Sequence, residues 1–141
     1  MKNTWIQYGY SFPLGNFEGF TVKEPFIDVV LSHNGRYFPQ LSMIDSGAYI
    51  ITMVSDDMRG IFGIDASACK KVNVGGIVGE RVEGFLHNMT MSVDKFDESI
   101  KVPVVFVPGL KTNMLLGQIG FFEKFKIRFE NSANSFYLSK V

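Results

Sequence analysis

Turn signals between short apolar segments constrain this fold most strongly, because they predict hairpins. The clearest is Asn34-Gly35, which separates "FIDVVLS" from "RYFPQLSMI". Both turn residues tolerate positive φ, as a tight hairpin requires. We therefore expect strands near 26–32 and 36–44. A second, longer hairpin is expected where "KKVNV" and "RVEGFLHNMTMSV" flank the glycine-rich "GGIVGE".

The rest of the chain adds further strands and little helix. The segments "KVPVVFV", "FKIRFE" and "SFYLSKV" are typical of strands. One short helix is expected to start at Ser55 as its N-cap and to run to about Phe62, and a second after Gly117, through "QIGFFEKF", is left open. No linker or repeat divides the 141 residues. We expect a single all-β domain over 1–141, with 1–20 as a loose N-terminal extension or a dimer-interface strand.

Charge and cysteine content exclude several classes of function. Lysine plus arginine equals aspartate plus glutamate at 14 each, so no strong field is available for nucleic acid or an anionic membrane. No apolar segment approaches the ~20 residues that a membrane-spanning helix needs. The single cysteine, Cys69, cannot form an internal disulfide, and the start "MKNTWIQYGYSF" lacks a signal-peptide core. We expect a cytoplasmic protein with neither nucleic acid nor membrane as a partner.

The stretch "MIDSGAYIIT" sets the ionisable Asp45 between two apolar segments. A buried carboxylate is costly unless it is paired or hydrogen-bonded. The triplet Asp-Ser-Gly is therefore either an ordinary Asx-turn between strands or a reactive group. His33, His87 and Cys69 provide no close cluster of metal ligands, so we expect no metal and no cofactor.

Around Asp45 the sequence resembles the retropepsin-like aspartic proteases, whose single-domain members carry one Asp-[Ser/Thr]-Gly-Ala and a later apolar-apolar-Gly. Here these elements are Asp45 to Ala48 and "NMLLGQIGFF". The family's short helical turn, glycine-tipped flap hairpin and "VP" strand are matched by "SDDMRGIFGI", "VNVGGIVGERVEGF" and "VPVVFVPG". The resemblance covers about residue 25 to the end and implies a closed retropepsin-like β barrel. Ser46 and Tyr49 depart from the commoner residues, and Tyr49 puts the size of the substrate in doubt.

The resemblance also implies a mechanism. Two carboxyl groups about 3 Å apart share one proton, so that one activates water while the other protonates the amide. Because the chain carries one such triplet, the second Asp45 would come from the other subunit of a homodimer. The substrate would be a peptide or protein bound as an added strand beneath the flap.

Site residues follow from the same resemblance. The catalytic set comprises Asp45, Ser46 and Gly47. Substrate-binding residues would be Ala48, Gly75, Gly76, Ile77, Val78 and Gly79, and structural support would come from Leu115, Leu116 and Gly117. Ile50, Ile77, Val78 and Leu116 are also candidates for an apolar pocket or for plain core. Two alternatives stay open: a catalytically silent peptide-binding or oligomerising module with the same barrel, and an unrelated ligand-binding or structural β barrel.

Overall fold

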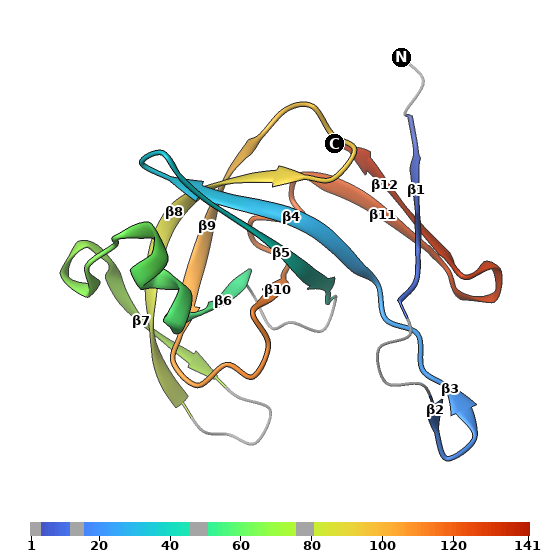
Figure 1. The fold of residues 1–141 in the computed structure, drawn as a ribbon, viewed down its shortest axis with the longest axis horizontal. Helices are drawn as coiled ribbons and strands as arrows, with labels where there is room; N and C mark the ends of the chain where they lie inside the picture. Colours follow the sequence, from blue (N-terminus) through green and yellow to red (C-terminus); the bar gives the residue numbers. More distant parts are fainter. Residues whose placement is uncertain (1–3, 12–15, 46–50, 76–80) are drawn as a thin grey trace.

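The computed structural model describes residues 4–11, 16–45, 51–75 and 81–141. Six strands form a closed barrel (Figure 1). In order around the barrel they are β4 (Phe26–His33), β5 (Arg36–Ile44), β10 (Met114–Leu116), β6 (Met53–Ser55), β9 (Ile100–Val107) and β8 (Arg81–Val93), and β8 pairs back onto β4. The expected all-β class and the closed barrel are thereby confirmed.

Alternation along the strands fills the barrel with apolar side chains. In β4, Ile27, Val29 and Leu31 are buried, and they point inward because successive residues of a strand face opposite sides. Large aromatic side chains complete the core. Those fully buried are Phe62, Phe106, Phe121 and Phe136.

The first hairpin forms as its turn predicts. Asn34 has φ 48° and Gly35 has φ 76°, and the flanking strands pair in antiparallel register from His33–Arg36 to Phe26–Met43. The second hairpin joins β7 (Lys70–Gly75) to β8, with Lys70 opposite Leu86 and Gly75 opposite Arg81. Farther along, β8 pairs with β9 and then with β4, so the β7–β8 hairpin extends from the barrel wall.

Helical structure is limited to 3-10 turns in the described residues. The expected helix after Ser55 is η1 (Asp56–Phe62), although the Ser55 side chain makes no capping hydrogen bond. Two shorter turns are η2 (Ala66–Ala68) and η3 (Asn131–Ala133). The second helix considered after Gly117 is absent from this described segment, because residues 118 and 120–124 form turns around a β-bridge at Ile119, and Gly120 adopts φ 96°, which an α-helix excludes.

A separate three-stranded sheet stands beside the barrel. Its strands are β1 (Ile6–Gly9), β12 (Ser135–Lys140) and β11 (Phe125–Glu130), with β12 in the middle. Tyr8 is buried, stacks on Phe136 at 5.3 Å between ring centroids, and donates its hydroxyl to the carbonyl of Asp94. Part of the stretch considered loose is therefore a strand paired within its own chain.

A small hairpin, β2 (Asn16–Phe17) and β3 (Phe20–Thr21), lies between β1 and β4 in the chain and projects from the body of the fold (Figure 1). Among the described residues, no helix is long and apolar enough to cross a membrane.

Candidate active site at the end of strand β5

Asp45 is the first residue after β5 and is half-buried. At this point β5 runs parallel to β10, with Met43 opposite Leu115 and Ile44 opposite Leu116. The amide of Asp45 donates to the carbonyl of Leu116 at 3.1 Å, and the amide of Ile44 donates to the carbonyl of Pro25 at 2.9 Å. The backbone that carries the Asp45 carboxyl is thus held from two sides.

Gly117 lies against Ile51 and Thr52, the two residues just before β6. A Cβ built on Gly117 would come within 2.6 Å of the carbonyl carbon of Ile51, 2.7 Å of its oxygen and 3.0 Å of the amide nitrogen of Thr52. All three atoms belong to the backbone, so this contact requires glycine.

Hydrogen bonds link the segment before β6 to the segment after β10 where the two segments cross. The amide of Gly117 donates to Oγ1 of Thr52 at 3.1 Å, and the amide of Thr52 donates to the carbonyl of Ile119 at 3.2 Å. Ile51 and Ile119 also form an isolated parallel bridge. Residues 51–52, before β6, and residues 117–119, after β10, are therefore joined by backbone and hydroxyl contacts.

The expected site residues fall into three groups. Leu115 and Leu116 lie on β10 beside Asp45, and Leu116 is fully buried in the main core, the second of the two roles considered for it. Gly75 is exposed at the end of β7. Apart from Asp45 and Gly117, described above, the other residues considered for the site lie outside the described residues: Ser46, Gly47, Ala48, Tyr49, Ile50, Gly76, Ile77, Val78 and Gly79.

An apolar pocket of about 200 Å³ lies between the β7–β8 hairpin and the barrel wall. It reaches the Asp45 region through Ile51 and Ile119, the two residues that bridge beside Gly117. The remaining lining residues come from β6, β7, β8 and β9: Met53, Val72, Asn73, Val74, Leu86 and Val105.

Gly84 allows this hairpin to lie close to the barrel. A Cβ on Gly84 would overlap the Val105 side chain and come within 3.4 Å of Val74 Cγ2. The sequence analysis did not identify the pocket residues. A glycine inside a strand pattern, such as Gly84, signals that another part of the chain approaches closely. Val72 and Val74, which alternate in "KKVNV", share one face of β7, and this alternation was the available signal.

The two histidines and the cysteine do not form an alternative catalytic or metal-binding site among the described residues. The His33 and His87 rings meet edge to face at 4.8 Å between centroids, and burial first and His87 second lower the pKa of His33. Burial raises the pKa of the Cys69 thiol, which disfavours the reactive thiolate. Within the described ranges, no group of three His, Cys, Asp or Glu residues could hold a metal ion.

No protein-family model matches the chain, and no curated protein matches it.

Proposed function

We propose that the protein is an aspartic endopeptidase with a retropepsin-like barrel, active as a homodimer in which each subunit contributes one Asp45. The observation that carries the proposal is the hydrogen-bonded backbone at Asp45. Its backbone is hydrogen-bonded to β10, and Ile51 and Thr52, just before β6, lie against Gly117 at backbone distance. A catalytic group must be held in a fixed position, and packed backbone provides this better than a free turn would.

The chemistry requires two carboxyl groups. One is ionised and takes a proton from water, while the other is protonated and donates to the leaving amide nitrogen. The chain has one Asp-Ser-Gly triplet. A two-fold axis passing beside Asp45 would bring the same residue from two subunits together, because an isologous interface pairs identical surfaces.

Substrate recognition would use the pocket beneath the β7–β8 hairpin. An extended peptide presents alternate side chains to a groove, and a pocket of about 200 Å³ suits an apolar one of moderate size. Its lining residues Ile51 and Ile119 also form the bridge beside Gly117, the residue that follows β10 next to Asp45. A substrate side chain seated there would lie close to the proposed catalytic group.

The deciding experiment replaces Asp45 with Asn and measures cleavage of a peptide library at pH 5 and pH 7, with and without pepstatin. We expect the wild-type protein to cleave in a pepstatin-sensitive manner and Asp45→Asn to lose at least about a thousandfold, as when other essential catalytic groups are removed. Asp97→Asn, at an exposed loop position, is the matched control and should cleave as wild type does.

Two results would contradict the proposal. Retained cleavage in Asp45→Asn would remove this residue from the mechanism. A folded wild-type protein that binds library peptides and never cleaves them would instead support the catalytically silent module.

A further inference from the structure

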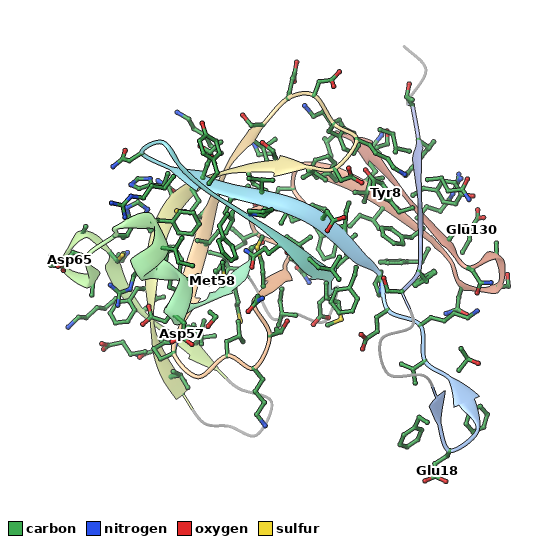
Figure 2. The ribbon with its side chains drawn as sticks, viewed as in Figure 1. Tyr8, Glu18, Asp57, Met58, Asp65 and Glu130 are labelled. Atoms are coloured by element: carbon green, nitrogen blue, oxygen red, sulfur yellow. The ribbon has the colours of Figure 1, made fainter. Side chains whose placement is uncertain are left out.

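Two separate apolar clusters fill the interior of the fold. The main core includes Met58 of η1, which lies on the barrel side of that turn (Figure 2). The smaller cluster surrounds the pocket beneath the β7–β8 hairpin. Its buried members are Met53, Val105 and Val107, and β7 contributes Val72 and Val74 as partly buried members. Because these side chains are only partly buried, an apolar group bound in the pocket would remove more of their surface from water.

The lining of this pocket restricts its ligand to an uncharged apolar group. Among the described lining residues, Asn73 is the one polar residue and none is ionisable. A charged side chain that entered the pocket would lose its water and find no ionic partner among them. A cavity of about 150 Å³ lined by apolar side chains admits benzene. A pocket of about 200 Å³ can therefore hold the side chain of a leucine or a phenylalanine.

Gly84 lies between two side chains that line the pocket. It is buried on β8, opposite Val72 of β7. A Cβ built on Gly84 would overlap Cγ1 of Val105, and it would lie 3.4 Å, an ordinary contact distance, from Cγ2 of Val74. The side chain of Val105 would therefore have to move, whereas that of Val74 would not.

Strand pairing restricts how Val105 can respond to a methyl group at position 84. Its backbone is held on both sides, because β9 pairs with β8 at Leu86 and with β6 at Met53. The β8 backbone has little room to shift along β9, since the same Cβ would lie 3.2 Å from the carbonyl oxygen of Phe106. The Val105 side chain is 2% exposed and lines the pocket, so rotation about χ1 would turn a methyl group into the pocket.

We propose that Gly84 sets the capacity of this pocket, which accepts a side chain as large as that of leucine or phenylalanine because position 84 carries no side chain. Gly84 acts through Val105 and does not contact the ligand, so it is a positioning residue. That the bound group is a side chain of a peptide substrate rests on the proposed function. The capacity of the pocket does not, since it depends on packing alone.

Binding of benzene tests the capacity of the pocket without any cleavage. Chemical shifts of the valine and leucine methyl groups are followed as benzene is added to the wild type, to Gly84→Ala and to the matched control Gly9→Ala. A Cβ on Gly9 meets nothing within 4 Å, and Gly9 also lies in a strand. We expect the wild type and Gly9→Ala to bind alike, with shifts at Val74 and Val105. Gly84→Ala should bind at least about tenfold more weakly, the effect of one methylene group in an apolar pocket.

A second substitution tests whether Gly84 acts through Val105. In Gly84→Ala/Val105→Ala the overlapping methyl group is gone, so the affinity for benzene should return at least to the wild-type value. Removing the overlap also protects the double variant against a folding defect of Gly84→Ala. If the single variant does not fold, the double variant is compared with Val105→Ala. Equal affinities of these two variants would support the proposal, because an alanine at position 84 then has no valine methyl group to displace.

Cleavage of the peptide library tests whether the ligand is a substrate side chain. At the position where the wild type selects an apolar residue, Gly84→Ala should lower the ratio of kcat/KM for phenylalanine to kcat/KM for valine about tenfold. Gly9→Ala should leave this ratio unchanged. A loss of stability alone would lower both values of kcat/KM together and leave their ratio as it was.

Three results would overturn the inference: equal affinity for benzene in the wild type and Gly84→Ala, weaker binding in Gly84→Ala/Val105→Ala than in Val105→Ala, or an unchanged ratio of kcat/KM in Gly84→Ala. If cleavage still requires Asp45 in any of these cases, the proposed endopeptidase stands without a role for Gly84. If benzene binding depends on Gly84 as expected and no peptide is cleaved, the proposed function fails and the capacity of the pocket stands.

Discussion

Replacing Gly117 with alanine should destabilise the protein sharply, because the added methyl group has no room. Its Cβ would lie 2.6 Å and 2.7 Å from the carbonyl carbon and oxygen of Ile51, and 3.0 Å from the nitrogen of Thr52. Real Cβ atoms essentially never lie within 3.0 Å of another heavy atom, as the two contacts with Ile51 would require. Relief requires the Ile51–Thr52 backbone to move, and this backbone is anchored to Ile119 by a hydrogen bond and a bridge.

The size of the effect follows from two contributions. Overpacking a well-packed site costs about 1–3 kcal/mol. Loss of the hydrogen bond from the Gly117 amide to Oγ1 of Thr52, 3.1 Å long, adds about 1 kcal/mol. The free energy of unfolding should therefore fall by about 2–4 kcal/mol, which lowers Tm by roughly 10 °C in a domain of this size. Gly117→Val should be worse still.

Thermal unfolding followed by circular dichroism measures the effect. Gly60→Ala is the control, because a Cβ on Gly60 meets nothing within 4 Å and Gly60 lies in the η1 turn. Its Tm should be unchanged or slightly raised, since alanine restricts the unfolded chain more than glycine does. A Tm for Gly117→Ala close to that of Gly60→Ala would refute the packing argument. Peptide cleavage should fall together with Tm if the contacts of Gly117 with Ile51 and Thr52 position Asp45.

Further predictions concern the pocket, the histidine pair and the aspartate. Val74→Trp should fill part of the pocket and raise KM for apolar peptides roughly tenfold with little change in Tm; an unchanged KM would place substrate elsewhere. The lowered pKa of His33 means that its contribution to stability is full above about 6.5 and is lost as pH falls toward the folded-state value. The decrease in Tm from pH 7 to pH 5 should therefore be smaller in His33→Gln than in the wild type. An equal decrease would show that His33 does not contribute to the pH dependence of stability. Asp45→Asn should raise the Tm of the dimer at pH 7 by removing repulsion between two carboxylates, and an unchanged Tm would argue against their proximity.

Local chemistry explains what could be predicted of the fold. Asn34 and Gly35 both adopt positive φ, so their turn follows from residue type alone. The strands that follow period-two alternation lie close to where they were expected, including β4 and β5. Secondary-structure predictions failed where the alternation of apolar and polar residues was short or where tertiary contacts determined the backbone conformation. The four residues of β1 have too little pattern to predict, and their strand depends on pairing with β12.

The segment after Gly117 shows how tertiary structure overrides local preference. "QIGFFEKF" has apolar residues at helical spacing, yet Ile119 pairs with Ile51 and accepts from Thr52, residues more than sixty positions earlier. Gly120 then takes φ 96°, and the chain turns into β11. A helix would have removed the contacts that join this connection to the one carrying Asp45.

The sequence by itself determined the β class, the main hairpins and the candidate Asp45, because backbone preferences and side-chain alternation act over a few neighbouring residues. Only the tertiary structure decided that Gly117 packs on Ile51, that Gly84 lies against Val105, and that β6 to β9 line an apolar pocket. These features depend on atoms brought within a few ångströms by barrel closure. No local pattern encodes that distance, since it results from the packing of strands far apart in the chain.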